Sequence, residues 1–428
     1  MKQVNKKNRR YIHNFGATPQ KRGRVYLDHA AGTPVSADVL KKIISATKND
    51  FGNPSGLHQE SVASKKTLKE SRVKTASFLS AHPDEIIFTS GGTESNNIAI
   101  LGTFEFLLKE TGGNLKNFHA VTSATEHSSV IEVFKGLEKK GLKVTYLQVS
   151  EDGLIDISEL KKSLRGETAV VSIMYANNEI GTVQPIREIA KTIRHFRKHK
   201  IKNKKSGRKK VLNESYPIFH TDACQAALYL EMNVLRLGVD LLTLSGSKIY
   251  GPRETGVLFK RRGINLSPIF KGGNQEFGLR PGTENVLGAL GVAEALEIAG
   301  KNKQKEFKKV ARLRDYFLKK IIKDNPEIII NGSLSERLPN NINISFPGID
   351  NEELVIRLDA LGVACSTKSA CKSDDAEVSY VIRALGENHY PESAVRFTLG
   401  RGTEKKELDY ATQAIKESLK LMTKNYKL

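Results

Sequence analysis

The sequence predicts an α/β protein built on a mostly parallel β-sheet, followed by a smaller α+β domain. From about residue 25 to 285, short apolar runs alternate with amphipathic stretches of helical length. This alternation favours a parallel sheet covered on both faces, because parallel strands are joined by helical crossovers. After about residue 305 the alternation gives way to a long charged helix and a few further elements, which indicates a second domain.

The individual elements are predicted from apolar spacing and length. Strand-like runs lie at 25–27, 85–89, 120–122, 144–149, 170–174, 218–221, 241–244 and 256–259. The clearest helical stretches between them lie at 57–79, 129–140 and 185–199. In the second domain the sequence predicts a strand at 341–346 and helices at 352–361 and 405–423.

Composition and cysteine usage indicate a soluble globular chain. Of its 428 residues, 39% are hydrophobic and 27% are charged, which is typical of folded soluble domains. No apolar run reaches the roughly 18 residues that a membrane helix needs, and we see no secretory signal. The cysteines, Cys224, Cys365 and Cys371, lack the paired spacing of a disulfide framework or a metal site. We therefore expect a cytoplasmic protein without membrane association or a bound metal.

The net charge of +21 is concentrated in two basic segments. Residues 1–24 carry eight Lys and Arg, residues 191–210 carry eleven, and neither segment contains an acidic residue. We interpret 1–24 as a basic N-terminal extension and 198–210 as an exposed basic insertion. Solvated surface segments would explain them, and so would arms that bind an acidic protein or, less favoured, nucleic acid. Residues 1–24 also have the acid-free composition of a transit peptide, which we favour least.

Two polar motifs directly follow predicted strands, where ligands bind in open α/β sheets. The first is the glycine-rich stretch 89–97, which contains Gly92 and Thr93 and opens a helix. Free N–H groups at such a helix start attract phosphate, although a capped glycine turn is also a common structural feature. The second motif is 125–128, which contains His127. A single histidine at this place is more often structural than catalytic, so it gains weight only from its neighbours.

An aspartate and a lysine at successive strand ends indicate a pyridoxal phosphate site. Asp222 ends one predicted strand, and Lys248 follows the next strand, 26 residues further on. Pyridoxal phosphate (PLP) requires a carboxylate beside its pyridine nitrogen, so that the ring works as an electron sink, and a lysine that forms a Schiff base with its aldehyde. Ser245 and Ser247, beside the lysine, are suited to bind the phosphate.

Two residues near the C-terminus complete the candidate site. Arg396 interrupts an apolar, strand-like run, so it needs a buried partner, which either a substrate carboxylate or a structural salt bridge would supply. Cys371 lies in the polar run 366–373, with Lys368 and Lys372 nearby. Nearby lysines favour the thiolate, the nucleophilic form of cysteine. We therefore expect Cys371 to be a nucleophile.

With these motifs assembled, the chain resembles the cysteine desulfurases, PLP enzymes of the class V aminotransferase superfamily that mobilise sulfur for iron–sulfur clusters and tRNA thiolation. The resemblance runs from about residue 25 to the end and rests on the segments 26–31, 51–55, 89–97, 125–127, 177–181, 221–225, 245–252, 280–283 and 369–371. It is strongest to the branch with the longer cysteine loop. It implies a fold-type I PLP-dependent transferase with a mostly parallel seven-stranded sheet. We expect a large PLP-binding domain at 36–303 and a small domain, 25–35 plus 304–428, that carries Cys371 and Arg396.

The resemblance also implies the site residues. The catalytic residues would be Cys371, Lys248 and His127. The residues that bind PLP would be Lys248, Gly92, Thr93, His127, Asn177, Asp222, Gln225, Ser245, Gly246, Ser247 and Thr283. Arg396 and Asn177 would bind the substrate, L-cysteine. Thr283 would reach the phosphate of the neighbouring subunit in a homodimer.

The implied reaction converts L-cysteine to L-alanine while the Cys371 thiolate takes the sulfur as a persulfide. The sulfur would then pass to a protein acceptor, such as an iron–sulfur scaffold or a tRNA-thiolation protein. The alternatives are another class V enzyme, either an aminotransferase or a selenocysteine lyase, and, less favoured, a non-enzymatic basic binding protein.

Two positions depart from the family pattern. Ser247 replaces the usual histidine before Lys248, so we expect an altered affinity for the cofactor. Lys368 replaces the usual glycine of the cysteine loop, which should slow its motion or change the acceptor. Cys365 lies six residues before Cys371, where the family usually has a small residue, and we favour core packing for it over a role as a resolving thiol. Cys224 is likewise expected to pack in the core.

Overall fold

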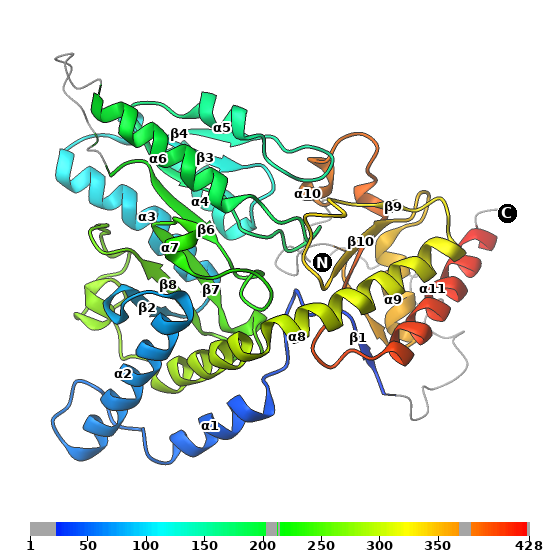
Figure 1. Ribbon diagram of the computed structural model, residues 1–428, viewed down its shortest axis with the longest axis horizontal. Coiled ribbons are helices and arrows are strands. Elements are labelled where there is room, and N and C mark those ends of the chain that lie inside the picture. Colours follow the sequence, from blue (N-terminus) through cyan, green and yellow to red (C-terminus); the bar gives the residue numbers. More distant parts are fainter. Residues whose placement is uncertain (1–22, 203–211, 213–214, 368–377, 426–428) are drawn as a thin grey trace, which may run out of the picture.

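A seven-stranded sheet forms the centre of the larger part of the molecule (Figure 1). Its strands are β2 (Ile86–Thr89), β3 (His119–Ser123), β4 (Lys143–Leu147), β5 (Thr168–Ser172), β6 (Ile218–Asp222), β7 (Leu241–Ser245) and β8 (Gly256–Lys260). The computed structural model describes residues 23–202, 212, 215–367 and 378–425. The strand order is β2-β8-β7-β6-β5-β3-β4, and only β8 runs antiparallel to its neighbours. The predicted mostly parallel sheet is therefore confirmed.

Helices cover both faces of this sheet, because successive residues of its strands point to opposite sides and both sides are apolar. The helices of this part are α1 (Ala37–Thr47), α2 (Gln59–Leu79), α3 (Gly92–Thr111), α4 (Ser128–Lys139), α5 (Ile157–Ser163), α6 (Ile186–Lys202) and α7 (Val234–Leu237). In β7, Leu241 belongs to a core with Phe104 of α3. Its neighbour Leu242 belongs to the opposite core, with Ile189 of α6.

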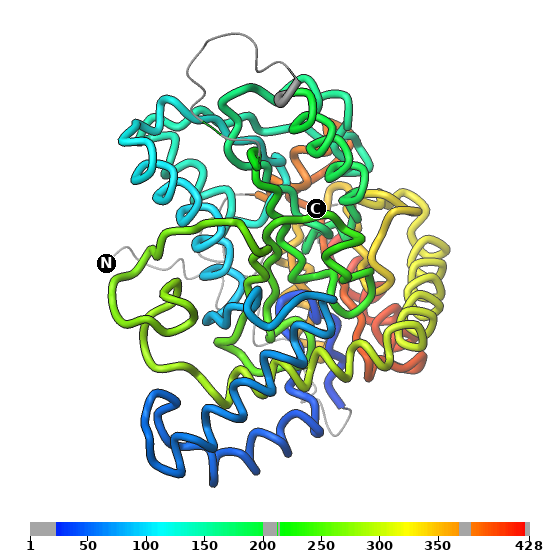
Figure 2. The backbone as a smooth tube through the Cα atoms, turned by 60° about the vertical axis from the view of Figure 1, so that its left-hand side comes forward, coloured from blue at the N-terminus to red at the C-terminus, as the bar shows by residue number. Residues whose placement is uncertain are grey.

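One long helix, α8 (Val286–Asp324), connects the two parts of the molecule. Its first half lies beside α1 and α2, and its second half packs with α11 (Lys405–Asn425), as Figures 1 and 2 show. Leu296 accordingly belongs to the core of the larger part and Phe317 to that of the smaller part. The predicted domain boundary at 303/304 falls inside this continuous helix, so the domain limits stay a prediction.

The smaller part combines short strands with the remaining helices. These elements are β1 (Val25–Tyr26), β9 (Ile329–Ile330), β10 (Asn341–Ser345), β11 (Val363–Ala364), β12 (Ala394–Thr398), α9 (Asn351–Ala360) and α10 (Tyr380–Arg383). Strands β12, β10 and β9 form an antiparallel sheet, and β1 pairs in parallel with β11. The segment at 25–26 therefore joins strands that come much later in the chain.

The predicted basic segments are largely outside the described residues. Helix α6 continues to Lys202, so the predicted insertion at 198–210 begins within a helix, whereas 203–211 and 1–22 are not described. None of the described helices combines the length and the apolar character needed to cross a bilayer. Over the same described ranges, no three His, Cys, Asp or Glu side chains gather as metal ligands would.

Candidate active site

Side chains from the carboxyl ends of several parallel strands meet in one cavity. His127 follows β3, Asp222 ends β6, and Lys248 follows β7. The cavity has a volume of about 390 Å³, within the range of small-molecule sites. The predicted residues that line it are Gly92, Thr93, His127, Asp222, Gln225, Ser245, Ser247, Lys248 and Arg396. The structure therefore brings most of the predicted site together at the sheet edge where α/β proteins bind ligands.

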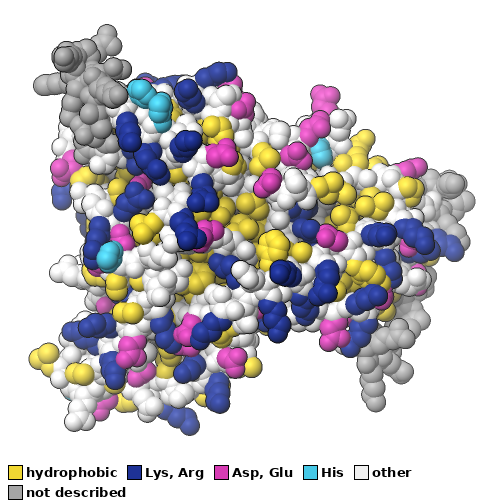
Figure 3. All heavy atoms as spheres, in the orientation of Figure 1, with side chains coloured by type: hydrophobic (Ala, Val, Ile, Leu, Met, Phe, Trp, Pro, Cys, Tyr) yellow, Lys and Arg dark blue, Asp and Glu magenta, His cyan; other side chains and the backbone are white. Residues whose placement is uncertain are grey.

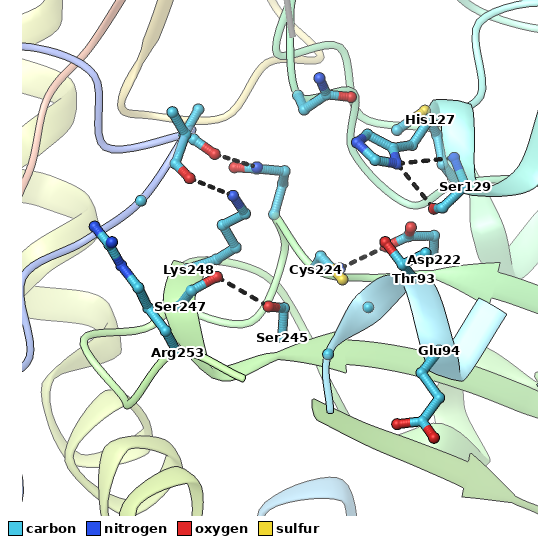
Figure 4. Close-up of a pocket in the computed structure, with 18 of the residues that line it drawn as sticks. Thr93, Glu94, His127, Ser129, Asp222, Cys224, Ser245, Ser247, Lys248 and Arg253 are labelled. Carbon is cyan, nitrogen blue, oxygen red and sulfur yellow. Dashed lines mark hydrogen bonds between the residues drawn. The ribbon is translucent and has the colours of Figure 1, made fainter. Parts of the chain in front are cut away.

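The start of α3 closes one end of the cavity. Gly92 and Thr93 lie in its first turn, whose backbone N–H groups have no partner within the helix. A Cβ at Gly92 would lie 2.7 Å from Sγ of Cys224, so a side chain does not fit there. The hydroxyls of Ser245 and Ser247 also line the cavity and lie 3.0 Å apart (Figure 4). Free N–H groups, the helix dipole and two hydroxyls together suit a phosphate.

Lys248 lies against a wall that is built from the segment after β1. Its Nζ donates to the carbonyl of Ala31 at 2.5 Å, and Nε2 of Gln225 donates to the carbonyl of Ala30 at 3.0 Å (Figure 4). The backbone N–H of Thr33 also donates to the carbonyl of Ser247 at 2.8 Å. The lysine amine is thus held inside the cavity by the chain that follows β1.

Asp222 and His127 face the cavity from two strand ends (Figure 4). Oδ1 of Asp222 accepts from the N–H of Cys224 at 2.9 Å, and Oδ2 accepts from Nδ2 of Asn96 at 2.7 Å, so the plane of the carboxylate is fixed. Burial lowers the pKa of His127, the charge of Lys248 lowers it further, and Asp222 opposes both. The imidazole is therefore neutral near pH 7, which allows it to stack on an aromatic ring without desolvating a charge.

Arg396 reaches the cavity from β12 with its side chain fully buried. Nη2 donates to Oδ1 of Asp28 at 2.7 Å, and Nη1 donates to the carbonyl of Asn178 at 2.9 Å. Among the described residues, its Nε has no hydrogen-bond partner, and it is also closed to solvent. A buried donor without a partner is costly, and a carboxylate bound in the cavity would satisfy it once the guanidinium shifts toward it. The salt bridge and the substrate contact, which the sequence left as alternatives, can therefore coexist.

Three predicted residues do not line the cavity. Nδ2 of Asn177 donates to the carbonyl of Thr125 at 2.8 Å, and its Oδ1 accepts from two backbone N–H groups. Gly246 lies between Ser245 and Ser247 in the chain, and a Cβ at this position would meet Oγ1 of Thr255 at 2.3 Å. Thr283 is exposed on the loop before α8. The amide of Asn177 is thus held by backbone groups in this structure, and the roles of all three residues stay predictions.

Cys371 and Lys368 lie outside the described residues, but both ends of their segment are fixed next to the cavity. Ser366 exchanges two backbone hydrogen bonds with Arg396, at 2.7 and 3.2 Å. At the other end, Oγ of Ser379 donates to Oε2 of Glu179 at 2.6 Å. The described chain on each side of the segment is therefore anchored near Arg396.

The two described cysteines differ in their surroundings. Cys365 is partly buried against the core of the smaller part, and burial raises the pKa of its thiol. Cys224 lines the cavity with its sulfur behind Gly92, and burial raises the pKa of this thiol as well. Both thiols are therefore protonated near pH 7, which fits packing better than nucleophilic attack.

The structure adds three residues without a predicted role to the site and its surroundings: Asp28, Asn96 and Ser129. Asp28 contacts Arg396 from 368 positions away, and no local pattern relates the two. Asn96 lies within the glycine-rich stretch, and Ser129 lies two residues after His127. Their proximity to predicted motifs was the only sequence signal for these two residues.

A comparison with protein families defines the class of this protein. The family Aminotransferase class-V matches residues 25–201 and 208–411. Because the match covers nearly the whole chain, the protein belongs to the class-V aminotransferases.

Within this class, the relatives are cysteine desulfurases. The chain is 41% identical over 392 residues to "Cysteine desulfurase IscS" of Dictyoglomus turgidum. The aligned region covers 91% of this chain and 93% of the relative. It is 39% identical over 399 residues to the protein of the same name from Neisseria meningitidis, with 92% of each chain covered.

Solved structures agree with these relatives. A NifS-like protein superposes with a TM-score of 0.81 at 31% identity and covers 93% of this chain and 100% of its own. The structure described as SspA in complex with cysteine gives a TM-score of 0.72 at 31% identity, with 88% and 98% covered. The chain is therefore a member of the cysteine desulfurase family.

Proposed function

We propose that this protein uses PLP to convert L-cysteine to L-alanine and transfers the sulfur to Cys371 as a persulfide. The observation that carries the proposal is the meeting of Lys248, Asp222 and Arg396 in one cavity. These residues supply a cofactor anchor, a partner for the pyridine nitrogen and a carboxylate clamp. The persulfide then passes to a protein acceptor, such as an iron–sulfur scaffold or a tRNA-thiolation protein, in the cytoplasm.

The residues present fit PLP. Lys248 would hold the cofactor, Asp222 would pair with the ring nitrogen, and His127 would stack on the ring. The N–H groups at Gly92 and Thr93 would bind the phosphate together with Ser245 and Ser247, because all four residues line the cavity and Gly92 has no side chain to cover its backbone. Gln225 would bond the ring hydroxyl. Asn177 would do the same only after it gives up a backbone contact.

The chemistry divides between the cofactor and the side chains. When bound, PLP withdraws electrons from the substrate carbons and makes the Cβ–S bond cleavable. Arg396 would bind the substrate carboxylate through its unpartnered Nε, which fixes the direction of the substrate. Nζ of Lys248 lies in the same cavity and would take the proton from Cα of the oriented substrate.

Cys371 would take the sulfur by direct attack. Its thiolate forms an S–S bond with the substrate sulfur while the Cβ–S bond breaks, and Cβ keeps the electron pair of the broken bond. Protonation of Cβ then gives the methyl group of alanine, so no external oxidant is needed. The anchoring of Ser366 at Arg396 supports this step. Cys371 comes five residues after Ser366, and five extended residues span at most roughly 17 Å, so the thiol cannot lie far from Arg396.

We also propose a homodimer in which Thr283 reaches the phosphate of the partner's cofactor. Thr283 is exposed rather than turned toward its own cavity. Large apolar side chains are exposed on the same part of the molecule: Phe51, Phe270 and Phe277 are 72%, 53% and 56% exposed. A second copy would bury such surface, which isolated monomers rarely leave exposed.

The test is an absorbance spectrum of the purified protein before and after L-cysteine is added, with alanine and sulfide quantified. With an added thiol as reductant, we expect the band of a lysine-bound cofactor, followed by equal amounts of alanine and sulfide, because the thiol reduces the persulfide to sulfide and frees Cys371. Cys371→Ser should keep the band but form neither product, whereas the control Cys365→Ser should behave as wild type. An aminotransferase needs no such cysteine, so full turnover by Cys371→Ser would contradict the proposal.

A further inference from the structure

Asn96 does not line the cavity, but it contacts Asp222 directly and His127 through Ser129. It lies near the start of α3 and is fully buried. Its Nδ2 donates to Oδ2 of Asp222 at 2.7 Å and to Oγ of Ser129 at 2.9 Å. The reverse orientation of the amide would set its oxygen against the carboxylate of Asp222. The contact with Asp222 therefore fixes which atom of the amide is the donor.

Ser129 continues this line of hydrogen bonds to His127. The backbone N–H of Ser129 donates to Nδ1 of His127 at 3.2 Å, and its hydroxyl lies 2.8 Å from the same nitrogen (Figure 4). A backbone N–H can only donate, so Nδ1 accepts and carries no proton. The neutral ring then carries its proton on Nε2. The hydroxyl of Ser129 accepts from Asn96 and donates to His127. The donor and the acceptor of each hydrogen bond from Asp222 to His127 are therefore defined.

We propose that Asn96 is a positioning residue that fixes the carboxylate of Asp222 and directs the hydroxyl of Ser129 onto Nδ1 of His127. The inference rests on the proposed function, because it assigns Asp222 and His127 to one bound cofactor. A neutral amide suits this place, because it supplies two donors without adding a charge beside the carboxylate. Loss of the amide would free the carboxylate to rotate and leave the Ser129 hydroxyl without its donor.

The test uses the full-length protein with 15N-labelled histidine. Asn96→Leu keeps the volume and removes both donors, and Ser129→Ala removes only the hydroxyl. In the wild type without cofactor, Nδ1 of His127 should show the chemical shift of an unprotonated nitrogen. Both variants should change this chemical shift without protonating Nδ1, because the backbone N–H of residue 129 still donates to it while the hydroxyl bond is lost or no longer directed. Asn96→Leu should also raise the Kd for PLP roughly tenfold or more, because it removes a hydrogen bond to a charged group.

Asn97→Leu is the matched control. The amide of Asn97 donates to the carbonyl of Thr93 within α3, so the same substitution one residue along should leave the chemical shift and the Kd unchanged. An unchanged Nδ1 chemical shift and Kd in folded Asn96→Leu would overturn the proposal. Should that variant not fold, an unchanged Nδ1 chemical shift in Ser129→Ala would overturn it equally. A protein that makes no alanine but shows the change in chemical shift would refute the proposed function alone, because the chemical shift is read without turnover.

Discussion

Ser366 and Arg396 exchange two backbone hydrogen bonds, with N···O distances of 2.7 and 3.2 Å. Arg396 also lies in register with Asn343 of β10, so it belongs to a continuous antiparallel frame. The side chain proposed to orient the substrate and the described chain that leads toward Cys371 are therefore fixed to each other. This arrangement would keep Ser366, at the described end of the chain before the cysteine, and the proposed carboxylate clamp in a constant relation when either part of the molecule moves.

Replacing Arg396 with Lys should weaken cysteine binding more than turnover. Lysine keeps the charge but lacks the planar guanidinium. In that group the two terminal nitrogens donate to Asp28 and Asn178, and Nε remains for the substrate. We expect KM for L-cysteine to rise roughly 10- to 100-fold, because a hydrogen bond to a charged group contributes about 1.5–3 kcal/mol. Steady-state kinetics measure this change. The exposed Arg312 is the matched control, and an unchanged KM in Arg396→Lys would contradict the assignment.

Replacing His220 with Asn should reduce the loss of stability in mild acid. His220 is fully buried on β6, with Nδ1 2.8 Å from Oγ of Ser172, and burial lowers its pKa to about 4. Between pH 6.5 and about 4 the unfolded chain binds a proton that the folded chain does not, so stability falls as the pH falls. This site contributes about 3 kcal/mol to that loss.

Urea unfolding from about pH 7 to pH 4.5 measures this effect. The stability difference between wild type and His220→Asn should shrink as the pH falls, whereas His199→Asn, on the exposed surface of α6, should leave the pH profile unchanged. Parallel profiles for wild type and His220→Asn would show that His220 titrates normally in the folded protein.

Replacing Gly300 with Ala should stabilise the protein. Gly300 lies in the middle of α8, between the two parts of the molecule, and a Cβ there would meet the ring of Phe78 at 3.4 Å, which is ordinary contact. Alanine should raise the free energy of unfolding by about 0.5–1 kcal/mol, because glycine loses more backbone entropy in a helix. Denaturant titration tests this, with Gly136→Ala in α4 as a control that has open space around it. A lower stability would mean that α8 is not continuous at this residue.

Replacing the five basic residues between 204 and 210 with serine should leave turnover unchanged. In the sequence these residues come between the end of α6 at Lys202 and the start of β6 at Ile218, whereas the site residues follow the carboxyl ends of the strands. We therefore expect the same kcat/KM with L-cysteine and a smaller salt dependence of binding to any acidic partner. Alanine formation and a pull-down at two salt concentrations measure the two effects. A large loss of turnover would assign the segment to catalysis.

The mostly parallel sheet could be predicted from the sequence because its signal is local. In β7, both Leu241 and Leu242 are apolar, as a strand covered on both faces requires, and Asp222 and Lys248 mark the ends of neighbouring strands. The continuity of α8 was not predicted, because its two halves pack in different cores and the change in composition near residue 305 resembles a domain boundary. Only packing shows that one helix serves both parts.

The sequence by itself determined the order of the strands along the chain, and it supplied the predictions of the cofactor motifs, of the nucleophile Cys371 and of the cofactor lysine Lys248. Each of these depends on residue type and on spacing over a few positions. The tertiary structure decided that Asp28 faces Arg396, that Asn96 links Asp222 to Ser129, and that the amide of Asn177 is held by backbone groups. Such contacts join residues that are far apart in the chain, and their partners are set by how the strands and helices pack rather than by any local pattern.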